Sequence, residues 1–377
     1  MTGALIAVAA LSLLVFLHPY ITYPLSLYLF RERSLKINTK ASAPSLALVF
    51  SAYNEERSLP AKIANLRDLK AAHPDLRIMA YCDLSSDRTL EMLKSASDVV
   101  ETIAAAQRTG KATGMARMAA SLDTDVVIFT DANVILDPAS IDPIRRHFSD
   151  PDVGGLAGSL HYTNDEASPT ARAGGLYWRL EEKVKQLESR CGSIMGADGS
   201  IFATRRSLYP VVPPHLLDDM TVSMSVPIEG RRLIFVPEVV AYEKNATAAS
   251  DEFRRKRRIA CRAFNTHRHL WPDIRARFGA TELYKYVSHK LLRWFGLIPL
   301  AIFLITGAAA LILSGQFFLL GFAGAAIAAG IALGLFGISP FSVVLQILVA
   351  VVATFFGITD SWKGNTYQTW TPAKSRA

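Results

Sequence analysis

The fold is decided by one stretch of the sequence, Val126-Val127-Ile128-Phe129-Thr130-Asp131-Ala132-Asn133. Its first four residues are β-branched or aromatic, and such a run is typical of a strand buried on both faces of a sheet. The run stops at a carboxylate and an amide. Ligands of open α/β sheets bind beyond the carboxyl ends of the strands, so Asp131 is well placed to hold a divalent cation against a diphosphate. Taken alone, the stretch would favour the simpler interpretation that Asp131 begins a turn.

Strands and helices alternate on the amino-terminal side of this stretch. The expected strands cover residues 45–50, 76–82 and 99–103, and the expected helices cover residues 59–69, 89–97 and 111–121. This alternation predicts an α/β fold with a parallel sheet and right-handed crossovers.

Each expected strand ends in polar residues that suit a nucleotide. They are Asn54 and Glu55, Asp83, Arg108 and Lys111, and Asp131. One such ending would indicate a turn. Four of them along one sheet edge favour a binding site.

The apolar residues gather at the two ends of the 377-residue chain, half of which is hydrophobic. Residues 1–30 and 291–358 are nearly free of charge and long enough to cross a bilayer. Arg31, Arg33 and Lys36 follow the first run, and by the positive-inside rule they place the central domain in the cytoplasm. The net charge of +8 lies mostly beside these apolar runs, which favours anionic lipid headgroups over nucleic acid. The three scattered cysteines indicate neither a disulfide framework nor a zinc site.

Three spans are expected near residues 295–313, 317–336 and 341–358. Three spans after a cytoplasmic domain would leave the tail outside, whereas Lys363 and Lys374 favour a tail inside. One of the three is therefore re-entrant, interfacial or part of a differently divided pair.

The middle of the chain contributes further candidates. Residues 153–159 are glycine-rich and expected to be extended, and residues 178–190 are charged at helical spacing, which predicts a solvated helix. Asp218 and Asp219 are neighbouring carboxylates that point to different sides of a short helix, so one can face a cleft while the other caps or pairs. Residues 251–271 form a basic amphipathic helix, which taken alone is more often a membrane-surface helix.

Several motifs resemble those of membrane-anchored family 2 glycosyltransferases, such as cellulose, hyaluronan and chitin synthases and ceramide glucosyltransferase. Thr130-Asp131-Ala132-Asn133 resembles the metal-binding DxD motif, and Arg255-Lys256-Arg257-Arg258-Ile259 resembles the (Q/R)xxRW motif. Four further segments resemble segments of the family: residues 51–56 its opening loop, 81–89 its acidic nucleoside-binding segment, 108–111 its diphosphate segment and 196–206 its acceptor-proximal loop. The resemblance implies a GT-A fold, with a mixed, mostly parallel sheet flanked by helices and transmembrane helices at both ends.

The resemblance also implies a role for individual residues. It assigns the metal, Mg²⁺ or Mn²⁺, to Asp131 and Asn133, and the general base to Asp219. It assigns the leaving diphosphate to Arg255 and Arg258. Nucleotide-sugar binding is implied for Tyr53, Asn54, Glu55, Asp83, Arg108, Lys111 and Asp131, and acceptor binding for Gly196, Asp198 and Asp218.

Three positions depart from the family pattern. Leu84 and Asn133 stand where a second acidic residue is usual, and Ile259 stands where Trp is usual. An amide oxygen still coordinates Mg²⁺ or Mn²⁺, with one negative charge less. The departure at Ile259 favours, weakly, a lipid or lipid-linked acceptor.

The expected organisation is an anchor at 1–30, a cytoplasmic GT-A domain at 44–245, interface helices at 250–294, membrane spans within 295–360 and a tail at 361–377. The hypothesis is an inverting hexosyltransferase of the inner or plasma membrane. It transfers a sugar, most simply from a UDP-hexose, to a lipid, a lipid-linked saccharide or a growing polysaccharide of the cell envelope. A translocation channel of so few spans would need a homo-oligomer or an accessory export partner. The alternative is a non-catalytic nucleotide-sugar scaffold or sensor, since both second acidic residues are missing.

Overall fold

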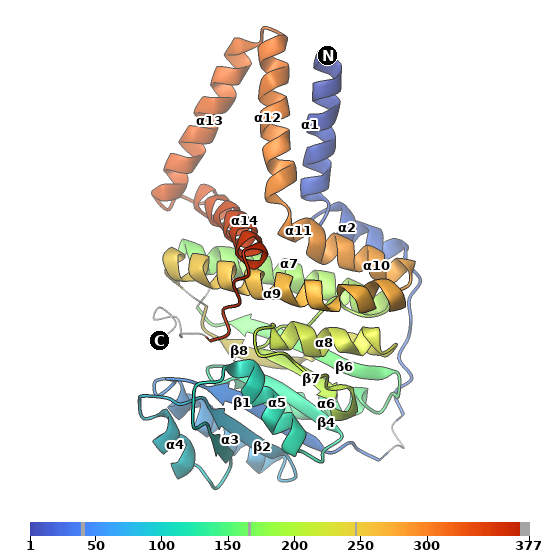
Figure 1. The fold of residues 1–377 in the computed structure, drawn as a ribbon, viewed down its shortest axis with the longest axis vertical. Helices are drawn as coiled ribbons and strands as arrows, with labels where there is room; N and C mark the ends of the chain where they lie inside the picture. The colour runs from blue at the N-terminus through green and yellow to red at the C-terminus, as the bar shows by residue number, and fades with distance from the viewer. Residues whose placement is uncertain (39–41, 165–166, 246, 370–377) are drawn as a thin grey trace.

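The computed structural model describes residues 1–38, 42–164, 167–245 and 247–369. Three layers follow one another along the long axis (Figure 1). A β-sheet with flanking helices forms one end, a layer of helices lies across it, and long apolar helices project from that layer at the other end (Figure 1).

The sheet has eight strands in the order β3-β2-β1-β4-β7-β6-β8-β5. The strands are β1 (Leu46–Ala52), β2 (Arg77–Cys82), β3 (Glu101–Ala104), β4 (Val126–Asp131), β5 (Ile135–Leu136), β6 (Val153–Tyr162), β7 (Ile201–Arg205) and β8 (Arg232–Glu243). The strands β1 to β4 are parallel to one another, whereas β7 runs antiparallel to both β4 and β6. The sheet is therefore mixed and mostly parallel, which confirms the predicted fold class.

The register brings the polar strand ends to one edge. Ser51 of β1 pairs with Asp131 of β4, and Ala52 of β1 pairs with Cys82 of β2. All seven residues of β1 and the first five of β4 are buried, because helices cover both faces. The covering helices are α3 (Leu59–Ala72), α4 (Thr89–Ser95), α5 (Lys111–Ser121) and α6 (Ile141–His147), with 3-10 turns η2 (Pro138–Ser140) and η4 (Arg206–Leu208) between elements.

The middle layer is made by helices that lie across the carboxyl half of the sheet. They are α7 (Pro169–Cys191), α8 (Asp218–Ile228), α9 (Ala249–Arg277), α10 (Ala280–Tyr286), the π-helical turn η5 (Val287–Leu291) and α11 (Leu292–Trp294). The prediction that residues 178–190 form a solvated helix is wrong, since Glu181, Lys185 and Glu188 of α7 are buried. Their charges lie inside because partners of opposite charge come from segments far along the chain, which helical spacing cannot reveal.

The apolar helices are α1 (Thr2–Leu17), α12 (Leu297–Leu313), α13 (Phe317–Leu335) and α14 (Phe341–Trp362). Among the described residues, α13 and α14 are each long and apolar enough to cross a membrane. Two further spans are possible if each of two bent helix pairs counts as one span. The first pair is α1 with α2 (Thr22–Ser26) and η1 (Leu27–Leu29), which meet at a bend of 70°. The second pair is α10–α11 with α12, which meet at a bend of 64°.

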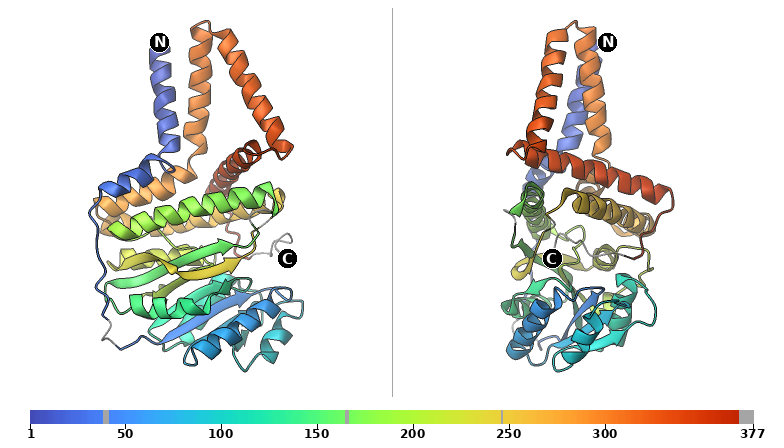
Figure 2. Two further views of the ribbon diagram at one scale, coloured as in Figure 1. Left: turned by 180° about the vertical axis from the view of Figure 1, so that it is seen from behind. Right: turned by 90° about the vertical axis from the view of Figure 1, so that its left-hand side faces the viewer.

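These helices differ in direction. Figure 2 shows α1, α12 and α13 projecting together from the middle layer, whereas α14 lies across their base, alongside α9. The helices α14 and α9 approach closely because Gly357 has no side chain: a Cβ there would lie 2.4 Å from the Arg257 carbonyl oxygen. Arg257 also forms an ion pair with Asp360, at 2.6 and 2.8 Å.

The chain then leaves α14 and returns toward the sheet edge. Asn265 Nδ2 donates to the Asn365 carbonyl at 2.9 Å, and Gln368 Nε2 donates to the Thr109 carbonyl at 3.3 Å. The family-like tail motif, Trp370-Thr371-Pro372 with Arg376, lies outside the described residues.

Candidate active site

Three charged side chains gather around Gly199, and we call this group the Gly199 cluster: Lys111, Asp131 and Asp219. Lys111 Nζ, at the start of α5, donates to Asp131 Oδ1 at 2.5 Å. A Cβ on Gly199 would lie 2.9 Å from Lys111 Nζ, 3.2 Å from Asp219 Oδ2 and 3.9 Å from Asp131 Oδ2. The glycine therefore keeps space open between the end of β4 and the start of α8.

The charges of the Gly199 cluster are unbalanced. Burial raises the pKa of Asp219 to about 7, the Asp218 carboxylate adds to this rise, and Lys111 opposes it. Burial alone would lower the pKa of Lys111, but Asp131, Asp218 and Asp219 outweigh burial and raise it above its usual value. Within the cluster one ammonium faces two carboxylates, and the neighbouring Asp218 has Arg262 as a second cation 3.8 Å away. The cluster therefore favours an added proton or cation.

The two neighbouring aspartates point in different directions, as their spacing predicts. Asp218 is buried, 3.7 Å from Lys111 Nζ and 3.8 Å from Arg262 Nη2. Asp219 is partly exposed, and its Oδ1 accepts a hydrogen bond from the Met220 backbone N–H at 2.6 Å. Asp219 is therefore the more accessible carboxylate, whereas Asp218 is held between two cations.

Asp83 holds the loop that carries Arg108 and Lys111. Its side chain is fully buried, and its oxygens accept hydrogen bonds from the backbone N–H groups of Thr109 at 2.7 Å and Gly110 at 2.9 Å. Gly110 needs its φ of +88°, which other residues rarely adopt. These contacts give Asp83 a structural part, and nucleoside binding by Asp83 stays a prediction.

The other predicted nucleotide residues lie on the same edge. The Arg108 guanidinium stacks on the Tyr53 ring, 3.3 Å from its centroid. Asn54 Oδ1 accepts from the Ser86 backbone N–H at 2.8 Å, and the Glu55 backbone N–H donates to Thr89 Oγ1 at 2.8 Å. Asn54 and Glu55 thus join the loops that follow β1 and β2.

A chain of hydrogen bonds runs from the metal motif toward the middle layer. Asn133 Nδ2 donates to Glu243 Oε1 at 3.0 Å, and Ser200 Oγ donates to Glu243 Oε2 at 3.3 Å. Asp198 accepts from the Ser200 backbone N–H at 3.2 Å and from Lys185 Nζ at 2.9 Å. Asn133 and Asp198 are therefore linked through residues absent from the sequence prediction.

Glu243 and Lys62 are the residues that the sequence interpretation missed. Glu243 ends the apolar strand β8, and a carboxylate in this place is the same signal that singled out Asp131. Lys62 of α3 is fully buried, and its Nζ donates to the Val134 carbonyl at 2.6 Å, directly behind the metal motif. The sequence did not single out Lys62 because a lone lysine in a helix usually faces solvent.

The two predicted arginines lie three residues apart on α9. Arg255 Nη1 lies 3.4 Å from Glu252 Oε2. Burial alone would lower the pKa of Arg255, but Glu252, Tyr162 and Glu243 outweigh burial and raise it. Arg255 therefore lies within the field of the hydrogen-bonded chain that reaches Asn133, and Arg258 shares its face of the helix.

The residues at the end of β4 fit a divalent cation. The Lys111 ammonium already takes a cation's place against Asp131, and Asp131 and Asn133 offer hard oxygen atoms. Within the described ranges, no three His, Cys, Asp or Glu side chains gather as a complete metal site. This donor set suits Mg²⁺ or Mn²⁺, which typically bind one or two carboxylates together with substrate phosphates.

The fold is similar to that of solved glycosyltransferase structures. The structure is similar to that of the mannosyltransferase PcManGT from Pyrobaculum calidifontis in complex with GDP-Man and Mn2+, with a TM-score of 0.73 and 17% sequence identity, covering 96% of this chain and 99% of that chain. The mannosyl-3-phosphoglycerate synthase from Rubrobacter xylanophilus matches with a TM-score of 0.43 and 15% identity, covering 62% and 75% of the two chains. No curated protein matches the sequence. The fold is therefore that of GT-A glycosyltransferases.

One part of the sequence matches a known family. Residues 48–211 match the model of the family described as "Glycosyl transferase family 2". This segment of the chain is therefore similar to the family 2 glycosyltransferases. The matched part contains Lys111, Asp131 and Gly199, whereas Asp219, Arg255 and Arg258 follow it.

Proposed function

We propose that this protein is a membrane-bound inverting glycosyltransferase that transfers a hexose, most simply from a UDP-hexose, to a lipid or lipid-linked acceptor of the cell envelope. The observation that carries the proposal is the convergence of Lys111, Asp131 and Asp219 around the open space at Gly199. A carboxylate with a pKa near 7 beside a cation site is the combination that a single displacement requires.

Asp219 is the general base in this proposal. The acceptor oxygen forms a bond to the anomeric carbon as the bond from that carbon to the diphosphate breaks, and Asp219 takes the hydroxyl proton. Burial and Asp218 raise the pKa of Asp219, which lets it accept a proton near neutral pH. Attack on the face opposite the diphosphate inverts the anomeric configuration.

The diphosphate is bound by cations on the opposite side of the donor. Asp131 and Asn133 would hold Mg²⁺ or Mn²⁺, which supplies charge compensation as the nucleoside diphosphate departs. Lys111, which lies against Asp131, would bind a phosphate oxygen of the donor. Arg255 and Arg258 neutralise the departing group from α9. Tyr53, Asn54, Glu55, Asp83 and Arg108 shape the nucleoside side of the site.

The membrane arrangement follows from the directions of the helices. We propose that α1, α12 and α13 cross the bilayer and that α14 lies at its surface on α9. Since α12 leaves the catalytic side and α13 returns to it, the tail ends on the same side as the domain, in agreement with Lys363. Exposed leucine, isoleucine and phenylalanine side chains on α12 and α13 support this arrangement, because they would otherwise face water.

The arrangement also favours a membrane-borne acceptor. The middle layer lies between the sheet and the spans (Figure 1). An acceptor anchored in the bilayer could reach Asp219 from this side. Gly196, Asp198 and Asp218 are the acceptor-side residues in this proposal.

Release of nucleoside diphosphate by the purified full-length protein in native membrane lipids tests the proposal. We expect Mn²⁺- or Mg²⁺-dependent release with one donor from a panel of nucleotide sugars, and its loss in Asp131→Ala and Asp219→Asn. If no donor turns over while one binds wild type and Asp219→Asn equally well, the protein is a nucleotide-sugar scaffold and the proposed base is wrong.

A further inference from the structure

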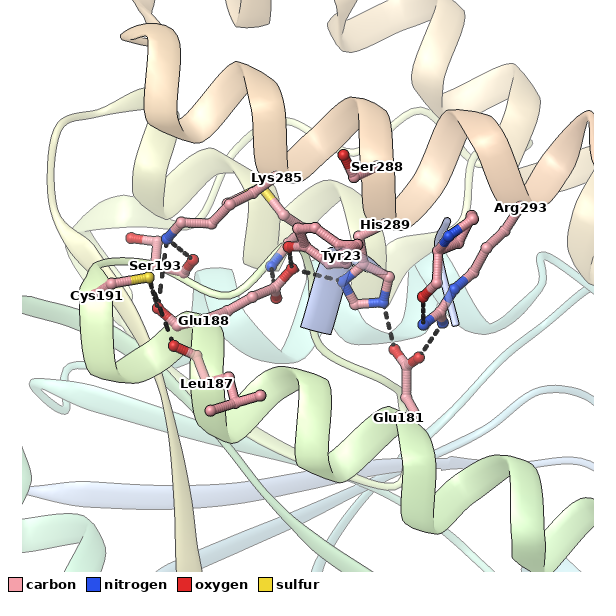
Figure 3. Close-up of polar contacts among 12 residues, drawn as sticks. Tyr23, Glu181, Leu187, Glu188, Cys191, Ser193, Lys285, Ser288, His289 and Arg293 are labelled. Carbon is pink, nitrogen blue, oxygen red and sulfur yellow. Dashed lines mark hydrogen bonds and ion pairs between the residues drawn. The ribbon is translucent and has the colours of Figure 1, made fainter. Parts of the chain in front are cut away.

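A second group of buried charges lies in the middle layer, and we call it the interface cluster: Tyr23, Glu181, Glu188, Lys285, His289 and Arg293 (Figure 3). His289 lies between two carboxylates, with Nδ1 2.8 Å from Glu188 Oε1 and Nε2 2.9 Å from Glu181 Oε1. Arg293 pairs with Glu181, and Tyr23 donates to Glu188. Each charged group of the interface cluster therefore has a hydrogen-bond or ion-pair partner.

The remaining charges nearby are paired as well, except one. Lys285 Nζ donates to the Ser193 carbonyl at 3.0 Å, and Lys185 pairs with Asp198. Lys290 follows His289 directly on the π-helical turn η5 and is only partly exposed. Within the described part of the chain, its ammonium has neither an ion pair nor a hydrogen bond. Lys290 is therefore a cation next to the interface cluster that has no direct partner within the described residues.

The Lys290 side chain lies beside Gly196, on the acceptor side of the site, where Glu181 and Glu188 of the interface cluster also act on its charge. A Cβ on Gly196 would lie 3.9 Å from Lys290 Cε and 3.8 Å from Ser223 Oγ. Ser223 follows Asp219 by four residues on α8, so the two lie on one face, about 6 Å apart along the helix axis. Lys290 is therefore about one helical turn from the base, on the side of the membrane spans.

We propose that Lys290, with the Gly196 backbone and the Ser223 turn, binds a phosphate group of the acceptor, next to the hydroxyl or oxygen that receives the sugar. Lys290 is partly exposed and has no direct counter-ion among the described residues, so its ammonium can take an incoming anion. Lysine is a suitable point-charge ligand for phosphate. Gly196, with a φ of +97°, leaves room for a group that any side chain would displace.

This inference deepens the proposed function and rests on it, because it names the chemistry of the acceptor. The shared chemistry is a phosphate monoester. Its source is either a lipid phosphate that enters from the bilayer or a phosphorylated small molecule that enters from water. Lys290 belongs to η5, which leads through α11 into α12, and this position favours the lipid.

The test measures binding of radiolabelled hexadecyl phosphate by the full-length protein in phosphatidylcholine nanodiscs. We expect saturable binding that weakens by about tenfold in Lys290→Met and stays within about threefold of wild type in Lys290→Arg. Arg268→Met is the matched control, because Arg268 is an exposed cation on α9 in the same layer. Its binding should equal that of wild type, whereas general attraction to the membrane would weaken both Met variants alike.

Competition by inorganic phosphate separates the two sources. A lipid source predicts that hexadecyl phosphate resists a large excess of inorganic phosphate, and equal affinity for both would overturn the lipid source. Absent binding, or equal binding in wild type and Lys290→Met, overturns the site. Donor turnover is measured in parallel without acceptor: if it fails while Lys290-dependent binding persists, the proposed enzyme activity is wrong and the phosphate site stands.

Discussion

The Gly199 cluster and the interface cluster are both built from buried charges, but they differ in balance. In the interface cluster two carboxylates meet a histidine, an arginine and a tyrosine, and their oxygens are hydrogen-bonded. In the Gly199 cluster two carboxylates share one lysine, and the neighbouring Asp218 lies between that lysine and Arg262. Pairing stabilises the first group, whereas the second remains ready for a metal, a proton or a diphosphate.

The direction of the pKa shifts reflects this difference. Burial alone would raise the pKa of Glu181, but His289 and Arg293 outweigh burial and hold it well below its usual value. Burial and Asp218 raise the pKa of Asp219 instead. Similar burial therefore produces a structural carboxylate in one place and a carboxylate suited to proton transfer in the other.

The strongest test of the comparison removes the proton acceptor of the Gly199 cluster. Asp219→Asn should lower sugar transfer by roughly 10²- to 10⁴-fold, because an amide cannot take the acceptor proton. Donor binding should persist, as measured by titration of the nucleotide sugar with Mn²⁺. A variant that retains transfer within a few-fold of wild type would remove Asp219 from the mechanism.

The matching change in the interface cluster should affect stability. Glu181→Ala leaves Arg293 without its carboxylate and His289 with Glu188 alone, which should cost about 3–5 kcal/mol of folding free energy. Thermal unfolding in detergent measures the loss. Lys183→Ala on the exposed side of α7 is the control and should be nearly neutral. Equal melting temperatures for wild type and Glu181→Ala would show that the buried pairs do not stabilise the fold.

The pH dependence of activity should report the raised pKa. Asp219 must be ionised to act as base, so kcat/KM should fall about tenfold per pH unit below pH 7 and level off above it. The contribution of Asp219 to the free energy of unfolding has the opposite pH dependence. The folded protein holds the Asp219 proton more tightly than the unfolded chain does, so this contribution is present at acid pH and is lost as the pH rises through about 7.

Asp219→Asn checks that assignment of the stability effect. The variant should melt at a higher temperature than wild type at pH 8, because the buried charge is gone. A lower melting temperature at pH 8 would contradict the raised pKa.

The smallest expected effect concerns the support behind the metal motif. Lys62→Met removes the hydrogen bond to the Val134 carbonyl and a positive charge near Asp131. We expect about fivefold weaker binding of Mn²⁺ with donor, about 1 kcal/mol, by titration. Lys94→Met, at an exposed position of α4, is the control and should bind as wild type does. Unchanged binding in Lys62→Met would limit Lys62 to a packing role.

The local elements were predictable because their signals are local. The run at 126–131 and the alternation before it gave the first four strands within two residues at their amino ends. Residues 111–121 match α5 at both ends. The predicted spans at 295–313, 317–336 and 341–358 correspond to α12, α13 and α14. Their packing was not predictable: α14 contacts α9 at Gly357 and Asp360.

The candidate site was predictable in part for the same reason. Asp131, Lys111 and Asp219 were identified by their motifs, and the structure brings them together at Gly199. Glu243 and Lys62 were missed because their importance depends on which loop they meet across the sheet. The assumed exposure of residues 178–190 failed because charges alone indicate solvent unless their partners are known.

The sequence by itself determined the α/β sheet, its ligand edge, the apolar segments and the polar residue types at the site, since strand periodicity, hydropathy and motif spacing are properties of neighbouring residues. Only the tertiary structure decided which charges are paired. The partners of Glu181 lie more than a hundred residues away along the chain. Charge balance is a property of three-dimensional neighbours, and it separates the satisfied interface cluster from the Gly199 cluster and from the unmatched Lys290.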